Sequence, residues 1–246
     1  MKYLPIYFIS LILSLIPFSV LASNIINVAT YIEPPFADNV GGKYVGRNIR
    51  LSKQIARHLN KQINFIRCPM ARCIMMMESG QTDMILSVLK TPQREKFMSY
   101  IEPAIGIQQM PVVFYTLKSK KFKVTSFKDL HSLLIGKVRG ARYFEEFDNN
   151  TSLSTIEVTS RGQLVQMLLK GRIDTFIARE ESIKPLIDHD DYQKLAISQY
   201  QYEVPVNGYI AVSKKSYLYE QRDEISTFIK QIQATGKLDK VYYTDP

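Results

Sequence analysis

Short apolar strands and amphipathic helices alternate along nearly the whole chain, and this alternation limits the possible folds more than any other feature. Residues 25–29 predict a first strand, and residues 49–59 predict a helix because Leu51 and Ile55 lie on one face at i+4 spacing. Further predicted strands, each followed by a predicted helix, continue as far as a long predicted helix at 217–234. Such alternation favours parallel sheets covered by helices. The sequence therefore predicts an α/β fold in one or two lobes.

The most informative segment is residues 80–103. A short apolar strand at 84–88 is followed by Thr-Pro-Gln-Arg. Thr91 is a suitable N-cap for a helix, and Pro92 suits the first helical position. Arg94 then lies in a turn whose unpaired N–H groups favour an anion, and its guanidinium can clamp a carboxylate. The alternative is a strand–turn–helix with an ordinary surface arginine.

This segment resembles the signature of the family 3 solute-binding proteins, the periplasmic receptors of polar amino-acid ABC transporters. In that signature, Gly-x-x-Asp and an apolar strand precede Thr-Pro-x-Arg, an aromatic residue and a proline. The matching residues are Gly80, Asp83, Thr91, Pro92, Arg94, Tyr100 and Pro103. Residues 31–36, 171–174 and 208–214 also resemble the family's first cleft loop, the matching turn of its second lobe and its returning strand.

The resemblance implies a type II periplasmic-binding fold, with mainly parallel sheets flanked by helices. Two such lobes, joined by two hinge strands, would close around a ligand. Lobe 1 would comprise residues 23–108 and 206–246, and lobe 2 residues 109–205. The hinge strands would lie near Gln109 and Val204. The resemblance also implies a monomer without a cofactor, whose partners are a small-molecule ligand and either an ABC permease or a membrane sensor.

Residues 1–22 have the pattern of an export signal. Lys2 provides the positive start, residues 6–16 the apolar run, and Ala22 a small residue at the cleavage site. A membrane anchor is the alternative, but the apolar run is shorter than the roughly 20 residues that span a bilayer. We therefore expect cleavage near Ala22 and a mature chain in the periplasm that starts near Ser23.

The charge and the cysteines fit an exported protein. The formal net charge is +9, which predicts a solvated basic surface or a cleft that attracts anions, because an exported chain rarely meets nucleic acid. The only two cysteines are Cys68 and Cys73, and an even count in an exported chain favours a disulfide. Zinc binding is the weaker alternative, because the three histidines are scattered. We expect no metal site.

Candidate ligand-binding residues follow the predicted strands, because open α/β sheets bind ligands beyond the carboxyl ends of their strands. In lobe 1 the candidates are Tyr31, Phe36, Met70, Ser87, Leu89 and Arg94. Arg94 would hold a ligand carboxylate, and Ser87 and Leu89 would offer backbone groups. The aromatic candidates would line the ligand side chain or belong to the core. Met70 stands where the family usually has an aromatic residue, which weakens any expectation of a stacked cationic ligand.

Lobe 2 departs from the family at one position. Amino-acid receptors of this family usually hold the ligand ammonium with an Asp, and Arg179 takes that place here. A shift of one residue would bring Glu180 into the cleft instead. Arg139 and Arg142 add cations at a strand end, unless they point to solvent. Together with Arg94, these arginines predict an acidic ligand or one with several acceptor groups.

We therefore expect a receptor, not an enzyme, that captures an amino acid or related anion for ABC-type uptake. One alternative is a free-standing sensory module. Another is a periplasmic enzyme of the cyclohexadienyl dehydratase type, in which Glu33, Glu180 or Glu181 could act as acid or base. The sequence contains no nucleophile-elbow, zinc-protease or phosphate-loop motif.

Overall fold

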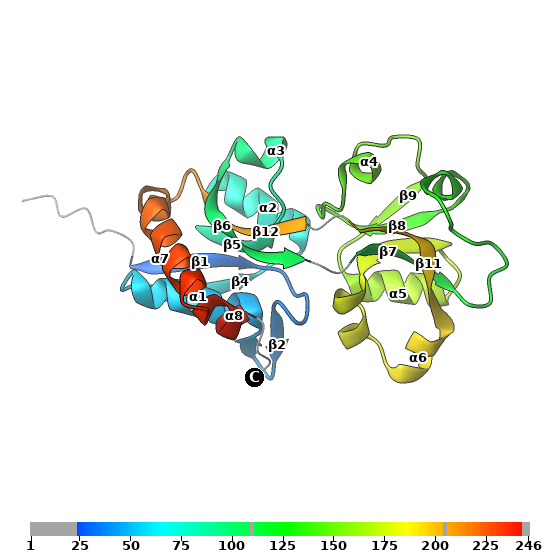
Figure 1. Cartoon of the computed structure of the whole chain (residues 1–246), viewed down its shortest axis with the longest axis horizontal. Coiled ribbons are helices and arrows are strands. Elements are labelled where there is room, and N and C mark those ends of the chain that lie inside the picture. The colour runs from blue at the N-terminus through cyan, green and yellow to red at the C-terminus, as the bar shows by residue number, and fades with distance from the viewer. Residues whose placement is uncertain (1–23, 109–110, 204–205, 243–246) are drawn as a thin grey trace, which may run out of the picture.

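Two separate sheets divide the chain into two lobes, which lie side by side in Figure 1. The computed structural model describes residues 24–108, 111–203 and 206–242. The sheet of lobe 1 has the strand order β4-β1-β5-β12-β6, and the sheet of lobe 2 has the order β11-β7-β10-β8-β9. The predicted export signal at 1–22 and the predicted hinge positions Gln109 and Val204 lie outside the described residues.

Lobe 1 combines an N-terminal part of the chain with one strand from much later in the sequence. Its strands are β1 (Ile25–Thr30), β4 (Gln62–Arg67), β5 (Met84–Val88), β6 (Met98–Gln108) and β12 (Val206–Ser213). β1 runs parallel to β4 and β5. β12 returns from lobe 2 and pairs antiparallel with both β5 and β6. A small hairpin of β2 (Asp38–Val40) and β3 (Lys43–Val45) stands apart from this sheet.

Helices pack on the lobe 1 sheet through the apolar faces that the sequence predicts. They are α1 (Arg47–His58), α2 (Met70–Ser79), the single turn α3 (Pro92–Glu95), α7 (Arg222–Ala234) and α8 (Lys237–Tyr242). Leu51 and Ile55 of α1 and Ile225 and Ile229 of α7 are fully buried in one core cluster. The predicted helix at 217–234 begins with a separate 3-10 turn, η5 (Tyr217–Gln221).

Lobe 2 is formed by a continuous stretch of chain. Its strands are β7 (Val112–Leu117), β8 (Ile135–Val138), β9 (Thr155–Val158), β10 (Thr175–Arg179) and β11 (Leu195–Tyr202). Its helices are η2 (Phe127–Ser132), α4 (Glu145–Asp148), α5 (Arg161–Leu169), η3 (Glu180–Ser182), η4 (Lys184–Leu186) and α6 (His189–Lys194). Buried aromatic side chains such as Phe114 and Phe176 fill its two cores.

Both sheets are mixed. In lobe 2, β8 pairs parallel with β9 and β10, whereas β7 pairs antiparallel with β10 and β11. Lobe 1 has the same division between parallel and antiparallel neighbours. The predicted α/β fold is therefore confirmed, with antiparallel strands next to the crossings between the lobes. In the described part of the chain, no helix is both long and apolar enough to cross a bilayer.

The predicted disulfide between Cys68 and Cys73 is present. Cys68 follows β4 and Cys73 lies in the first turn of α2, so the bond ties the end of a strand to the start of the next helix. Both sulfur atoms are engaged, which removes the zinc alternative for these cysteines. The bond lies in the core cluster beside Met77, one of the methionines of α2.

Candidate functional site: a basic cavity between the lobes

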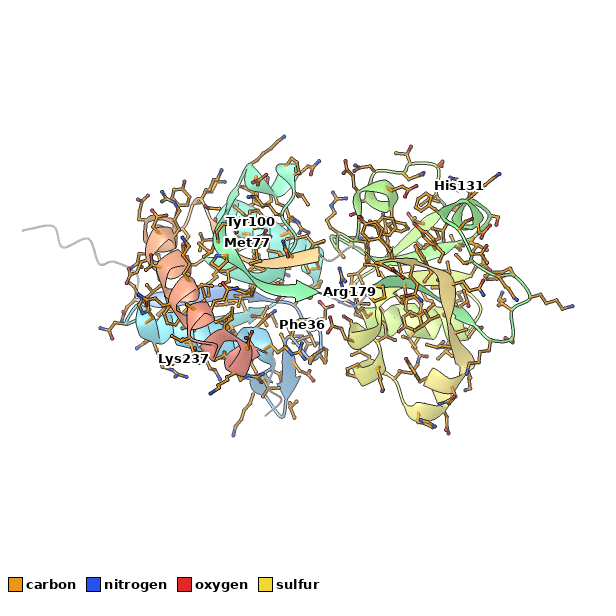
Figure 2. All side chains as sticks on the ribbon, viewed as in Figure 1. Phe36, Met77, Tyr100, His131, Arg179 and Lys237 are labelled. Carbon is orange, nitrogen blue, oxygen red and sulfur yellow. A yellow bond between two sulfur atoms is a disulfide. The ribbon has the colours of Figure 1, made fainter. Side chains whose placement is uncertain are left out.

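A small cavity of about 50 Å³ lies between the two lobes. Lobe 1 contributes Tyr31, Glu33, Met70, Ser87, Val88, Leu89 and Arg94, and lobe 2 contributes Ala141, Arg142, Tyr143, Arg161 and Arg179. Figure 2 shows the side chain of Arg179 at the junction of the lobes. Of the residues predicted to bind the ligand, the structure thus brings together Tyr31, Met70, Ser87, Leu89, Arg94, Arg142 and Arg179.

Arg94 is held in the cavity wall by the local structure that the sequence predicts. The hydroxyl of Thr91 accepts a hydrogen bond from the backbone N–H of Arg94 (3.3 Å), and Pro92 begins the helical turn α3. Arg94 is 6% exposed, and its guanidinium donates to the carbonyl oxygens of Leu89 (3.0 Å) and Gly140 (2.9 Å). Burial lowers the pKa of Arg94. The bond to Gly140 crosses from lobe 1 to lobe 2.

At Gly140 the backbones of the two lobes also approach each other closely. A Cβ atom at this position would lie 2.7 Å from Cα, 2.8 Å from N and 3.0 Å from Cβ of Ala71, in the first turn of α2. The residue also has a left-handed φ of +79°, which disfavours every residue with a side chain. Glycine at 140 therefore permits the lobes to meet at this point.

A second contact between the lobes involves Glu33, which the sequence indicated only as a possible acid or base. Glu33 is 5% exposed, and its Oε1 accepts from Nη2 of Arg161 (2.5 Å) and from Oγ of Ser182 (2.8 Å). Burial alone would lower the pKa of Arg161, but the Glu33 carboxylate together with Tyr31 and Tyr143 outweighs this effect, so that the pKa is raised. Glu33 thus joins lobe 1 to two side chains of lobe 2.

Arg179 ends β10 and is 9% exposed. Burial lowers its pKa, and the nearby carboxylates of Glu181 and Glu33 oppose that shift. Glu181, whose own pKa is raised by burial, lies 3.9 Å from Arg47 of lobe 1. This ion pair is a third contact between the lobes, and it lies close to Arg179.

Ser87 and Met70 complete the lobe 1 wall. Ser87 is buried with a left-handed φ of +57°, and its hydroxyl donates to Oδ1 of Asn48 (2.7 Å). Because that hydroxyl already donates its proton, the side chain of Ser87 can offer a ligand only an acceptor. The Leu89 carbonyl accepts from the Tyr100 hydroxyl (2.9 Å) as well as from Arg94. Met70 begins α2 and is 7% exposed.

Two predicted residues, Phe36 and Arg139, are placed differently. Phe36 is buried in the lobe 1 core and does not line this cavity, because its turn directs the ring under Arg47, whose guanidinium lies 5.6 Å from the ring centre. Arg139 is more than half exposed, and its Nε lies 3.2 Å from Oε2 of Glu157 on the neighbouring strand β9. The side chain of Glu180 lies outside the described part of the structure.

Several cavity residues were not among the predicted ligand-binding residues: Glu33, Val88, Ala141, Tyr143 and Arg161. Glu33 and Arg161 follow β1 and β9, so the rule that ligands bind beyond strand ends could have found both. Tyr143 is buried, and its hydroxyl accepts from the backbone N–H of Val138 (3.0 Å). Burial raises the pKa of Tyr143 to about 12, so the hydroxyl remains neutral.

The fold and the cavity together define a two-lobed binding protein with a basic cleft. Residues 26–244 match the family "Bacterial extracellular solute-binding proteins, family 3", and the chain belongs to this family. It is 24% identical over 212 residues to the arginine-binding extracellular protein ArtP of Bacillus subtilis, with coverage of 84% of this chain and 80% of ArtP. The family's members are partners of ABC transporters, and its fold is the predicted type II periplasmic-binding fold.

Solved structures share this fold at low sequence identity. An ancestral arginine-binding protein bound to arginine has a TM-score of 0.75 at 20% identity, covering 90% of this chain and 97% of that one. AbpA from Streptococcus pneumoniae, bound to L-arginine, has a TM-score of 0.73 at 23% identity, with coverage of 89% and 92%. The ancestral protein AncCDT-1, a precursor of cyclohexadienyl dehydratase, has a TM-score of 0.72 at 18% identity, with coverage of 89% and 93%.

Proposed function

We propose that this protein captures a small acidic ligand between its lobes, outside the inner membrane, for ABC-type uptake. The observation that supports this most strongly is the composition of the cavity wall, whose described side chains include four guanidinium groups and one carboxylate. Arg94 would clamp a ligand carboxylate, and Arg142 and Arg179 would bind a second acidic or acceptor group. Leu89, Met70, Ser87 and Tyr31 would enclose the remainder of the ligand.

The charges distinguish this cleft from one that binds arginine. ArtP, AbpA and the ancestral arginine-binding protein bind arginine, whose guanidinium and ammonium groups both require acceptors. Among the described side chains that line the cavity, Glu33 is the one carboxylate, and it already accepts from Arg161 and Ser182. A ligand cation about 4 Å from Arg179 would be repelled by about 4 kcal/mol at an effective dielectric constant of 20. A second carboxylate would be attracted by a similar amount.

Binding would be coupled to closure of the lobes. Arg94 lies in lobe 1 and Arg142 and Arg179 in lobe 2, so a ligand that touches all three binds the closed arrangement better than an open one. The export pattern at 1–22 supports a periplasmic location for this binding.

The enzyme alternative would need a free acid or base in the cleft. Glu33 is occupied by two contacts with lobe 2, so we assign it to joining the lobes and not to proton transfer. The remaining alternative, a sensory module, would use the same site and differ only in the membrane partner.

Titration calorimetry with succinate, glutamate, glutamine and arginine tests the proposed ligand class. We expect succinate and glutamate to bind and arginine to bind least. A thermal shift is an independent readout, because a ligand at a hundredfold excess over its Kd stabilises the folded state by about 2.7 kcal/mol. Tightest binding by arginine would contradict the proposal, and turnover of a prephenate-like compound would favour the enzyme.

A further inference from the structure

Glu33 is rigidly placed although it lies in a loop. The turn that carries it is closed by backbone hydrogen bonds, from Glu33 N to Ala37 O (2.8 Å) and from Ala37 N to Glu33 O (3.0 Å). The side chain leaves this turn towards lobe 2 and is almost completely buried. A carboxylate in such a position must keep its partners, because an unpaired buried charge is very unfavourable.

The partners of Glu33 in lobe 2 are equally fixed. Arg161 is the first residue of α5, whose start is held by a capping box between Ser160 and Gln163. Ser182 ends η3 and is fully buried. The bridge from Glu33 to Arg161 and Ser182 is therefore formed by three well-positioned side chains, and two of them, Glu33 and Arg161, line the cavity.

The space beside this bridge is small. A cavity holds one water molecule when the space open to the centre of a water-sized sphere is about 10–15 Å³. About 50 Å³ beside the bridge therefore accommodates only a few groups of that size, whereas the larger hollow of about 520 Å³ that shares Leu89, Arg142 and Tyr143 does not reach Glu33 or Arg161. On the side of the bridge, a compact diacid fits better than a long one, as long as Glu33 and Arg161 remain joined.

We propose that Glu33 is a specificity-determining residue that restricts the cleft to compact dicarboxylates. The bridge to Arg161 closes part of the cavity wall and, at the same time, neutralises one of the four arginines. A longer diacid would have to displace Glu33 before its second carboxylate could reach Arg161. This inference rests on the proposed function, because it concerns the same site.

The test is a chain-length series of malonate, succinate, glutarate and adipate, titrated against the full mature chain and two variants. For the unaltered protein, we expect affinity to fall from the shorter acids to adipate. Glu33→Ala removes the wall and releases Arg161, so the adipate-to-malonate affinity ratio should rise at least about tenfold. Glu33→Gln keeps the shape of the bridge, so the preference for short acids should persist, while every diacid binds more tightly.

Two further variants control for charge and folding. Glu157→Ala removes an equal charge from the exposed pair with Arg139, outside the cavity, and should leave the length preference unchanged. Glu33→Asp keeps the charge but shortens the side chain. It should move the preference partly towards longer acids, even if Glu33→Ala does not fold.

The outcomes separate this inference from the proposed function. If diacids bind but their order is the same in the unaltered protein, Glu33→Ala and Glu33→Asp, Glu33 does not determine specificity. If no diacid binds to any folded variant while glutamine or arginine binds, the proposed ligand class itself is wrong.

Discussion

The contact between Gly140 and Ala71 predicts that a single methyl group will oppose closure. In Gly140→Ala, the new Cβ would lie 2.7 Å from a backbone atom of Ala71, about 0.7 Å closer than an ordinary contact allows. Because the atoms that it meets belong to the backbone of Ala71, they cannot rotate away. The clash is relieved only if the lobes separate. That movement would weaken the hydrogen bond from Arg94 to the Gly140 carbonyl.

The expected loss of ligand affinity follows from the free energy of the hydrogen bond between Arg94 and Gly140. A hydrogen bond to a charged group contributes about 1.5–3 kcal/mol. Since each 1.4 kcal/mol changes affinity tenfold, Gly140→Ala should weaken ligand binding by about 10- to 100-fold. The assay is calorimetric titration with the tightest-binding acid.

Gly171→Ala is a matched control for the backbone conformation. Gly171 also has a positive φ, of +63°, but a Cβ there would meet nothing within 4 Å. Both variants should lose about 1–2 kcal/mol of folding stability from the left-handed conformation. Only Gly140→Ala should lose affinity. Equal affinity in the two variants would refute the role of this contact in closure.

Three further predictions concern the clamp, the disulfide and one helix cap. Arg94→Ala should weaken ligand binding by about 2–5 kcal/mol, because the ligand carboxylate loses its partner, whereas Arg139→Ala should bind normally; calorimetry decides, and equal losses would contradict the clamp. Protein from the periplasm should show no labelled thiol without reductant, and replacing Cys68 and Cys73 by Ser should cost about 2 kcal/mol in denaturant unfolding, as expected for so short a loop; free thiols would contradict the bond. The backbone N–H of Thr125 donates to the Asp129 carboxylate and lowers the pKa of Asp129. The charged carboxylate therefore stabilises the folded protein above the ordinary pKa of Asp, and this stabilisation is lost as pH falls through the lowered pKa. Asp129→Asn should therefore lower the melting temperature at pH 7 more than at pH 2, and a pH-independent difference would contradict the assignment.

Local signals in the sequence were sufficient for most elements and for the clamp. The strand Met84–Val88 and the Thr91 cap of α3 depend on neighbouring residues only, and both occur as predicted. The sequence predicts extended chain after Pro103 but not the first part of β6, because Pro103 interrupts its pattern and lacks the N–H that a central strand needs. β6 lies at the edge of the sheet, where this loss is tolerated.

The contacts between the lobes could not be predicted in the same way. Glu33 and Ser182 are separated by 149 residues, and only the crossing of the chain between the lobes brings them together. Phe36 and Tyr31 have the same aromatic character in sequence, yet one is in the core and the other lines the cavity, because a tight turn separates them. Which face a loop residue presents depends on such turns and not on residue type.

The position of β12 in lobe 1 has a consequence for the order in which the protein can be built. β12 separates β5 from β6, although it follows both of them by about a hundred residues in the chain. Lobe 2 is contiguous and has all its strands once residue 202 has been made. Lobe 1 must wait for residues 206–213, and until then β5 and β6 have no strand between them. Because domains generally fold as units during synthesis, the lobe that begins first is completed last.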